Sequence, residues 1–264
     1  MENSVNFSGK DIFFTEKGNG FPVVFLHGFM ETSAIWDDFA NELSASFRVI
    51  CPDLPGFGDT PVIAEIHTME LMARSVKAIL DGLGIEKCIM VGHSMGGYVT
   101  LEFAKLFPDL MNGFVMFHSQ AMADSEEARE NRRRTINIVK LNRAGFIRHF
   151  IPDLFAPANI EKFSAEIEIL QKHVADTTSQ GIISALEGMK ERHSNTELLT
   201  VTHLPVLFIA GKHDTRIPVQ NILAQAILPA HSEVLILGNS GHMGYIEARD
   251  ETLGMIRSFC ERFR

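Results

Sequence analysis

Three residues with the chemistry of nucleophilic catalysis each follow a short apolar run in this 264-residue chain. Ser94 follows CIMV within Gly-His-Ser-Met-Gly, Asp214 follows VLFIA, and His242 follows VLIL. A serine hydroxyl becomes a good nucleophile when a neighbouring imidazole takes its proton. A carboxylate that accepts the second N–H of that imidazole fixes its tautomer and stabilises the imidazolium form. The set therefore predicts Ser94 as the nucleophile, His242 as the base and Asp214 as the acid that orients the base.

The residues around Ser94 predict a sharp turn from a strand into a helix. Gly92 and Gly96 keep Cβ atoms out of the tight space between the two elements, so the turn can hold Ser94 in a strained conformation. Serine is also a common helix N-cap, and this pattern alone leaves a structural role open. For a nucleophile, the positive end of the following helix would face the developing oxyanion. We expect the backbone N–H groups of Met95 and Phe29 to bind it.

Apolar runs and helical patterns alternate along the chain. Runs bounded by turn residues predict strands buried on both faces at Val23–Leu26, Arg48–Cys51, Cys88–Val91, Phe114–Phe117, Val206–Ala210 and Val234–Leu237. Helical periodicity is found in Ser33–Leu43, Met69–Leu83, Met95–Phe107, Val219–Leu228 and Ile246–Arg262. The opening stretch VNFSGKDIFFTEKGNG predicts an antiparallel hairpin at a sheet edge. The predicted fold class is therefore α/β, a mostly parallel sheet with helices on both faces.

The alternation stops in the middle of the chain, where no strand-like run occurs. The periodicity there is helical, as in the apolar stripe that runs from Phe163 to Val174. We therefore predict a core formed by residues 1–118 and 203–264, with residues 119–202 as a helical cap over one end of the sheet. Ligands of a parallel sheet bind at the carboxyl ends of its strands, where the three candidate residues lie.

Composition and charge limit the partners that this chain can have. A net charge of −9 gives no attraction to nucleic acid or to an anionic membrane surface. The first residues lack the basic and apolar stretches of a signal peptide. The three cysteines cannot all pair, and neither they nor the histidines show metal-ligand spacing. We therefore expect a cytoplasmic protein without metal or cofactor that acts on a small molecule.

Four further residues are expected at the substrate pocket because they flank the predicted strand ends. They are His27 and Met30 after the first buried run, His93 beside Ser94, and His118 after the run FVMF. The two histidines at 27 and 93 also fit a structural role as polar groups of the core or of the loops. His27 in particular could support the loop that carries the oxyanion N–H.

Charged residues at the start of the helical segment have two explanations. Asp124 stands just before a helical pattern, and we expect it to cap that helix. The four arginines between Arg129 and Arg134 could capture a substrate carboxylate. Their i,i+3 and i,i+4 spacing from Glu126 and Glu130 instead favours a solvated face with surface ion pairs.

The motifs HGF, S-x-x-W, PDLPGFGDT, GHSMGG, GKHD and SGH resemble the α/β-hydrolase superfamily over nearly the whole chain. The stretch HSQAMADSEEARENRRR is similar to the cap start of small carboxylesterases and 3-oxoadipate enol-lactonase-like hydrolases. The resemblance implies a serine hydrolase of small esters or lactones that forms an acyl-enzyme on Ser94 without a cofactor. Many relatives carry aspartate where His118 stands, and some use it as the catalytic acid. That departure leaves Asp214 as the candidate acid here.

The resemblance leaves other functions open, because one fold hosts many chemistries. Enol-lactonases, C–C bond hydrolases and perhydrolases share this fold, and so do ligand-sensing signalling proteins with slow turnover. Dehalogenases and epoxide hydrolases are disfavoured, because those relatives carry aspartate at the position of Ser94. The natural substrate depends on the helical segment, whose side chains are not positioned by periodicity.

Overall fold

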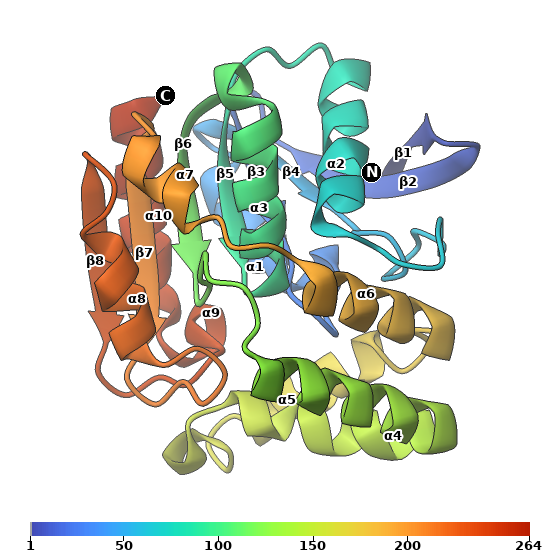
Figure 1. The fold of residues 1–264 in the computed structure, drawn as a ribbon. Helices are drawn as coiled ribbons and strands as arrows, with labels where there is room; N and C mark the ends of the chain where they lie inside the picture. The colour runs from blue at the N-terminus through green and yellow to red at the C-terminus, as the bar shows by residue number, and fades with distance from the viewer. Residues whose placement is uncertain (1) are drawn as a thin grey trace.

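The computed structural model describes residues 2–264 and contains a sheet with the strand order β1-β2-β4-β3-β5-β6-β7-β8 (Figure 1). The strands are β1 (Glu2–Phe7), β2 (Lys10–Lys17), β3 (Phe21–Leu26), β4 (Phe47–Pro52), β5 (Cys88–His93), β6 (Met111–Phe117), β7 (Val206–Gly211) and β8 (Ser232–Leu237). The β1–β2 and β2–β4 pairs are antiparallel. The other neighbouring strands are parallel. The predicted α/β fold, with a mostly parallel sheet and an antiparallel hairpin at its edge, is confirmed.

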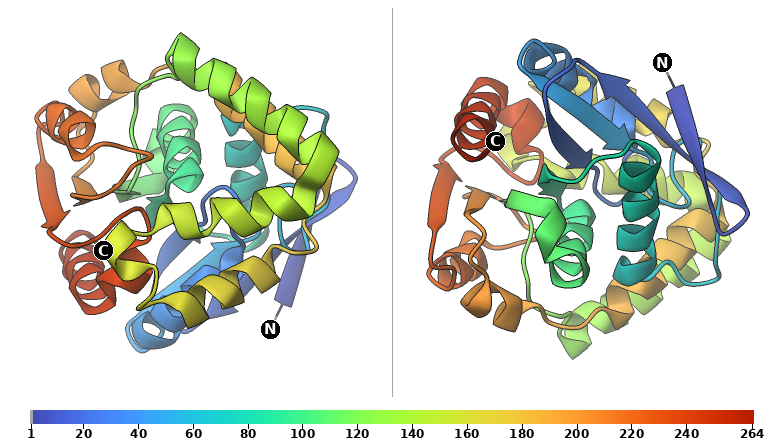
Figure 2. Two further views of the ribbon diagram at one scale, coloured as in Figure 1. Left: turned by 90° about the horizontal axis from the view of Figure 1, so that it is seen from below. Right: turned by 90° about the horizontal axis from the view of Figure 1, so that it is seen from above.

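Helices cover both faces of the sheet, which is why β5 and β7 are buried along their whole length. The helices α2 (Met69–Gly82), α3 (Met95–Leu106) and α8 (Val219–Ala226) lie on one face, and α1 (Asp37–Leu43) and α10 (Arg249–Phe263) lie on the other (Figure 2, right). Two predicted helices are divided. A 3-10 turn at Ser33–Trp36 precedes α1, and the short helix α9 (Gly244–Glu247) precedes α10. Within residues 2–264, no helix has both the length and the apolar character needed to cross a bilayer.

Helices fill the segment between β6 and β7 and lie across the carboxyl ends of the parallel strands (Figure 2, left). The helices that lie there are α4 (Glu126–Phe150), α5 (Ser164–His173) and α6 (Ser179–Glu191), whereas the last helix of the segment, α7 (Thr196–Val201), leads into the start of β7 (Figure 1). Their apolar residues point inward, because Ile167 and Leu170 of α5 and Leu186 and Met189 of α6 are buried. Helices α4, α5 and α6 therefore form a layer above the carboxyl ends of the parallel strands. The boundaries drawn for the core and the cap stay a prediction.

Helix α4 is broken at Asn142, whose φ of −153° and ψ of 75° are not helical. The Asn142 side chain accepts a hydrogen bond from the N–H of Gly145 at 2.9 Å, so it caps the second half of the helix. This second half carries Phe146 and Phe150, whose rings lie 6.4 and 5.5 Å from the ring of Phe29. The break thus lets α4 pack on the loop after β3.

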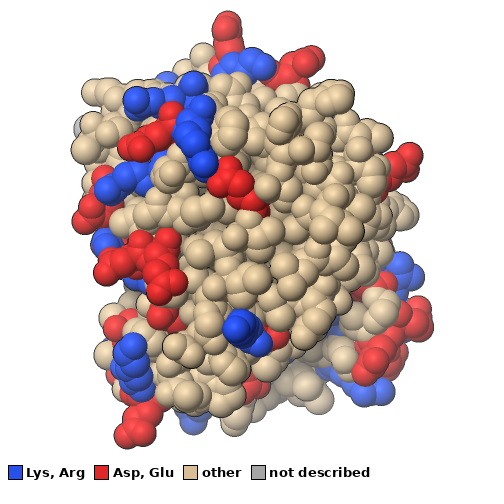
Figure 3. Space-filling model, turned by 90° about the vertical axis from the view of Figure 1, so that its left-hand side faces the viewer, with Lys and Arg blue, Asp and Glu red and all other residues tan. Residues whose placement is uncertain are grey.

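Strand β8 forms the edge of the sheet, and its burial differs from the expectation of two covered faces. Val234 and Ile236 are 38% and 40% exposed, because no strand pairs beyond β8 and only one of its faces is fully covered. Leu223 and Ile227, in and just after α8, are exposed as well. Figure 3 looks at the side of the molecule on which β8 lies and shows a broad central area with few charged side chains.

Candidate active site

Ser94 lies at the turn between β5 and α3, where the backbone adopts an unusual conformation. Its φ of 50° and ψ of −113° lie in a region that L-residues rarely occupy. The N–H of Ser94 donates to the carbonyl oxygen of Phe117 at 2.9 Å, which ties the turn to β6. A Cβ on Gly96 would lie 2.4 Å from the carbonyl oxygen of Leu26, so only glycine fits there. The turn leaves Ser94 partly exposed at the carboxyl end of the sheet.

The Asp214 carboxylate, in the loop after β7, accepts four hydrogen bonds. Its Oδ2 accepts from Nδ1 of His242 at 2.7 Å and from Nδ1 of His118 at 3.2 Å. Its Oδ1 accepts from the backbone N–H groups of Arg216 at 2.8 Å and Ile217 at 2.9 Å. All four bonds fix the carboxylate in place. Because Nδ1 of His242 carries the proton, its Nε2 is left as the basic nitrogen of the ring.

Charge within this cluster is set by the opposing effects of burial and hydrogen bonding. Burial alone would raise the pKa of Asp214. The neighbouring His242 and the hydrogen bonds from His118 and His242 outweigh burial, and they hold the pKa of Asp214 well below its usual range. Burial lowers the pKa of His118 to about 4, although the hydrogen bond to Asp214 opposes this shift. At neutral pH an ionised Asp214 therefore accepts from a neutral His118.

His118 adopts a left-handed conformation directly after β6, with a φ of 47°. Its ring is fully buried, and Nε2 has no hydrogen-bond partner within residues 2–264. A left-handed residue with a Cβ and an unsatisfied buried nitrogen each cost about 1–2 kcal/mol. The hydrogen bond to Asp214 is the interaction that offsets these costs.

A second buried network joins the loops on either side of Ser94. Oε2 of Glu31 accepts from Nδ1 of His93 at 2.8 Å and from the N–H of Gly28 at 2.5 Å. Oε1 of Glu31 accepts from the Tyr245 hydroxyl at 3.0 Å. Nε2 of His93 donates to the carbonyl oxygen of His242 at 2.9 Å. Both nitrogens of His93 donate, so this ring is an imidazolium paired with an ionised Glu31.

The pKa values in this second network agree with that assignment. Burial would lower the pKa of His93, but the charge and the hydrogen bond of Glu31 outweigh it and raise that pKa. Burial would raise the pKa of Glu31, yet His93 and the N–H of Gly28 keep it below its usual value. Burial and the Glu31 charge raise the pKa of Tyr245, so its hydroxyl keeps its proton and donates. The ion pair thus joins the loop after β3 to the end of β5, and the hydrogen bonds of His93 to the His242 carbonyl and of Tyr245 to Glu31 extend the network to the segment after β8.

The two N–H groups expected to bind an oxyanion belong to Phe29 and Met95. Met95 is the first residue of α3, so its N–H has no partner within the helix. Phe29 follows Gly28, where a Cβ would lie 3.1 Å from the Cβ of Ser94. The loop that carries Phe29 therefore lies directly against Ser94. This placement is compatible with an oxyanion site between the two N–H groups.

A cavity of about 280 Å³ opens beside Ser94 and His242, with walls from α4 and α6. Of the four residues predicted for the substrate pocket, His93 lines this cavity. His27, Met30 and His118 do not line it, and each is fully buried. The prediction is corrected for these three residues, because their side chains are fully buried behind the cavity wall, where that of His118 contacts Asp214.

His27 and Met30 are buried and support the conformation of the loop after β3. Nε2 of His27 accepts from the N–H of Leu54 at 2.9 Å, and its Nδ1 donates to the carbonyl oxygen of Gly28 at 2.8 Å. Met30 has a φ of 62°, which turns the loop, and its side chain is fully buried. The supporting role considered for His27 from the sequence therefore describes its contacts better than pocket lining does.

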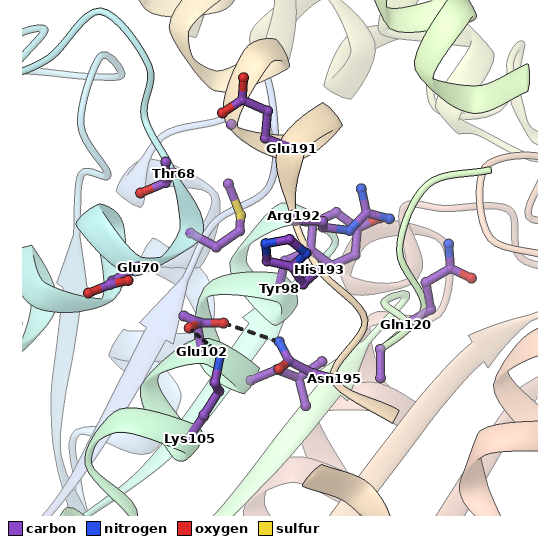
Figure 4. Close-up of a pocket in the computed structure, with 14 residues that line it drawn as sticks. Thr68, Glu70, Tyr98, Glu102, Lys105, Gln120, Glu191, Arg192, His193 and Asn195 are labelled. Atoms are coloured by element: carbon purple, nitrogen blue, oxygen red, sulfur yellow. Dashed lines mark hydrogen bonds and ion pairs between the residues drawn. The ribbon is translucent and has the colours of Figure 1, made fainter. Parts of the chain in front are cut away.

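A second cavity of about 250 Å³ lies between α2, α3 and the residues that follow α6 (Figure 4). Tyr98 borders both cavities, and the guanidinium of Arg192 lies over its ring at 4.0 Å. On the outer wall, Glu102 accepts a hydrogen bond from the amide of Asn195 at 3.3 Å. Of these two cavities, Ser94 lines only the first, so the candidate nucleophile borders only that one.

Asp124 is not the helix cap that the sequence predicted. The N-cap of α4 is Ser125, whose hydroxyl accepts from the N–H of Ala128 at 3.2 Å. The buried carboxylate of Asp124 instead accepts from Nη1 of Arg192 at 2.6 Å and from Nε of Arg132. Two guanidinium groups stabilise a buried carboxylate more than a few helix N–H groups would. They lower the pKa of Asp124 although burial opposes the shift.

The arginines at the start of α4 do not share one environment. Arg133 pairs with Glu126 and Glu130 at 3.0 Å, and Arg134 pairs with Glu130 at 3.5 Å, on an exposed face. The expectation of a solvated, ion-paired face describes these two residues correctly. Arg132 differs from them, because it turns toward Asp124 and lines the cavity beside Ser94.

Within residues 2–264, the cluster around Asp214 also brings together three side chains of the types that bind metal ions. Ligand atoms of His118, Asp214 and His242 lie within 4.8 Å of one another. Both Nδ1 atoms already donate to the carboxylate, and the backbone occupies its second oxygen. A metal would have to displace these hydrogen bonds, so the donor set fits a hydrogen-bonded cluster better than a metal centre.

Sequence patterns did not single out Glu31, Tyr245 or Arg216. Glu31 and its partner Tyr245 are 214 positions apart, so no local periodicity signals their contact. The available signal was their place in the chain, because Glu31 and Arg216 lie in the loops that follow β3 and β7, and Tyr245 lies in α9, the first helix after β8. A search of every polar residue after each strand would have included all three.

Comparisons with known proteins give a consistent result. The family described as "alpha/beta hydrolase fold" matches residues 22–249. A thermophilic esterase from Thermogutta terrifontis has a TM-score of 0.93 and 31% identity, covering 100% of this chain and 99% of that chain. The 2-hydroxy-6-oxo-6-(2'-aminophenyl)hexa-2,4-dienoic acid hydrolase of Metapseudomonas resinovorans is 24% identical over 99% of this chain and 91% of its own length. The dihydrolipoyllysine-residue acetyltransferase component of the acetoin cleaving system of Pseudomonas putida is 28% identical over 92% of this chain, which spans 64% of that protein.

Proposed function

Since the chain belongs to the α/β-hydrolase fold family, we propose that it is a serine hydrolase of small carboxylic esters or lactones. The observation that carries this proposal is the hydrogen bond of 2.7 Å between His242 and Asp214 beside the cavity that Ser94 lines. It supplies a base held in one tautomer next to a serine in a strained, partly exposed turn. The esterase relative supports ester chemistry at this site.

In the first half of the proposed reaction, Ser94 Oγ attacks the ester carbonyl while Nε2 of His242 takes its proton. Asp214 stabilises the imidazolium that forms. The negative charge on the carbonyl oxygen is bound by the N–H groups of Phe29 and Met95, each worth about 3 kcal/mol in the transition state. The imidazolium then gives its proton to the leaving alcohol, and an acyl-enzyme on Ser94 remains.

The second half repeats these steps with water in place of the alcohol. His242 takes a proton from the water, which attacks the acyl carbonyl, and the same two N–H groups bind the oxyanion. His242 returns the proton to Ser94 Oγ as the carboxylic acid leaves. No cofactor takes part in this scheme.

The proposal is tested with a panel of 4-nitrophenyl esters from acetate to decanoate. We expect repeated turnover of at least one ester and a fall of at least about a thousandfold in kcat for Ser94→Ala, with an unchanged circular dichroism spectrum. A fluorophosphonate should add its mass to the peptide that contains Ser94 in the native protein and not in the variant. Substantial turnover by pure, folded Ser94→Ala would remove Ser94 as the nucleophile.

A C–C bond hydrolase is the second candidate, and the dienoic acid hydrolase relative favours it because that protein aligns along nearly the whole chain. An enol-lactonase would use the same residues with a cyclic ester. A vinylogous diketone and an enol-lactone should be assayed beside the ester panel. The values of kcat/KM then rank C–C bond hydrolysis, lactone hydrolysis and ester hydrolysis as the activity of this protein. A ligand sensor on this fold would bind its ligand tightly and release product slowly, whereas an enzyme turns over repeatedly.

A further inference from the structure

Two arginines line the cavity beside Ser94, and acidic residues do not balance their charge. Arg132 comes from α4 and Arg216 from the loop after β7. Among the described residues that line this cavity, Glu31 carries the single carboxylate. Glu31 is 1% exposed and already neutralised by His93 at 2.8 Å. Among the side chains that line the cavity, positive charges therefore outnumber negative ones, although the ionised Asp214 lies behind this wall and acts on Arg216.

Arg132 shares its counter-ion with a second arginine. Its Nε and Nη2 donate to Asp124, and Nη1 of Arg192 donates to the same carboxylate at 2.6 Å. The side chains of Asp124 and Arg192 are 4% and 5% exposed, so solvent does little to screen this group. Two cations and one anion leave one positive charge. Because Asp124 binds the Nε side of the Arg132 guanidinium, the Nη1 side stays available for a second anion.

Arg216 has an even weaker counter-ion. Its nearest carboxylate oxygen, on Asp153, lies 3.9 Å away, and that side chain is 71% exposed. The guanidinium lies over the ring of Phe150 at 5.0 Å, which holds it at the cavity wall. Partial burial lowers the pKa of Arg216, and Asp153 and Asp214 do not reverse this shift. An anion entering the cavity would therefore improve the surroundings of Arg216.

We propose that this cavity selects esters or lactones that carry a carboxylate away from the bond to be cleaved, and that Arg216 and Arg132 bind this carboxylate. The proposal rests on the serine hydrolase function proposed above and names the substrate class of the same site. Planar guanidinium groups match a carboxylate through two parallel hydrogen bonds. Held in this way, the far end of the substrate fixes the position of the ester carbonyl over Ser94.

The first test compares substrates that differ in one charge. Mono-4-nitrophenyl adipate carries the carboxylate in its acyl chain, and its methyl ester is the neutral counterpart. 3-Acetoxypropanoate and its methyl ester place the same difference in the alcohol part. We expect kcat/KM to be at least about tenfold higher for the charged member of one pair, with the advantage reduced by added salt. Equal values in both pairs would overturn the proposal, even if Ser94 hydrolyses every ester.

The second test removes the positive charge of Arg216. Arg216→Gln should lower kcat/KM for the preferred charged ester about tenfold more than it lowers kcat/KM for the neutral ester, and the additional loss should lie mainly in KM. The matched control is Arg134→Gln on α4, whose side chain is 70% exposed and lies on the ion-paired face. This control should leave both esters unchanged.

Free adipate provides a readout that does not depend on turnover of a charged ester. We expect it to inhibit hydrolysis of 4-nitrophenyl butyrate competitively in the native protein and in Arg134→Gln. In Arg216→Gln the inhibition constant should rise by about tenfold. Equal inhibition of all three proteins, or equal loss of charged and neutral ester hydrolysis in Arg216→Gln, would show that Arg216 does not bind the carboxylate.

Discussion

The two sides of the cavity beside Ser94 are held by very different interactions. On the sheet side, the carboxylates of Asp214 and Glu31 accept four and three hydrogen bonds, and both are buried. On the side that faces the helical segment, α4 is broken at Asn142, and the Arg216 side chain, which comes from the loop after β7 and lies over Phe150 of α4, has one distant and exposed carboxylate partner. The proposed reacting groups are therefore fixed, whereas Arg216, which would meet the variable part of a substrate, is held more loosely than they are.

This contrast follows from what each side has to do in a hydrolase. A nucleophile, a base and an oxyanion site lose activity when displaced by about 1 Å, so their supports need complete hydrogen bonding. A surface that recognises a substrate must adjust to it. Side chains whose hydrogen-bond donors are not all used within the protein are suited to that task, because they can bind the substrate instead. Changes on the sheet side should therefore affect kcat, and changes on the helical side should affect KM.

The largest effect is expected from Asp214→Asn. The amide cannot accept the same hydrogen bonds and leaves His242 in the wrong tautomer, so kcat should fall by about 10⁴-fold. The matched control is Asp124→Asn, which neutralises another buried carboxylate at the helical side and should change kcat by less than about tenfold. Both are measured with the same neutral ester on purified variants whose circular dichroism is native. A crippled Asp124→Asn with a nearly normal Asp214→Asn would mean that the proposed acid is wrong.

A smaller effect is expected from Glu31→Gln, which removes the charge that pairs with His93. The loop that carries Phe29 and the loop that carries His242 would then be joined by neutral hydrogen bonds only, so kcat should fall by about tenfold to a hundredfold with little change in KM. Tyr245→Phe is the matched control, since it removes one hydrogen bond to Glu31 and costs about 1 kcal/mol of stability. If KM rises instead while kcat stays normal, the network serves substrate binding and the contrast between the two sides fails.

The smallest effect concerns the pH dependence of stability through His118. Its pKa is about 4 in the folded protein and about 6.5 in an unfolded chain, so the unfolded chain binds more protons between these values. Stability is therefore fully present above pH 6.5 and is lost as the pH falls toward 4. From pH 7 to pH 5 this loss amounts to about 2 kcal/mol.

His118→Asn tests this expectation, because asparagine tolerates the left-handed conformation and its amide can donate to Asp214. Urea unfolding at pH 7 and pH 5 should show a smaller loss of stability in the variant than in the native protein. The raised pKa of His93 acts in the opposite direction, but it is common to both proteins and cancels in the comparison. Identical losses in the two proteins would show that His118 is not the group that titrates.

The sequence by itself determined the fold class and the candidate reacting residues. Apolar runs that alternate with helical patterns specify a parallel sheet, and the carboxyl ends of its strands lie at one edge whatever the details of packing. Ser94, Asp214 and His242 could be found in this way because each follows such a run. The strained turn at Ser94 could also be predicted from the sequence, because the glycines that permit it, Gly92 and Gly96, lie close to Ser94 in the chain.

Only the tertiary structure decided how charged and polar side chains are paired. Glu31 meets Tyr245 across 214 positions, and Asp124 meets Arg192 across 68 positions, which is why Asp124 could not be recognised as an ion-pair partner. The hydrogen bond between His118 and Asp214, which are 96 positions apart, could not be predicted from the sequence either. Periodicity reports which face of an element is apolar, because burial repeats with the geometry of the helix or strand. It contains no information on which distant group a buried charge will face, since that depends on how the elements pack.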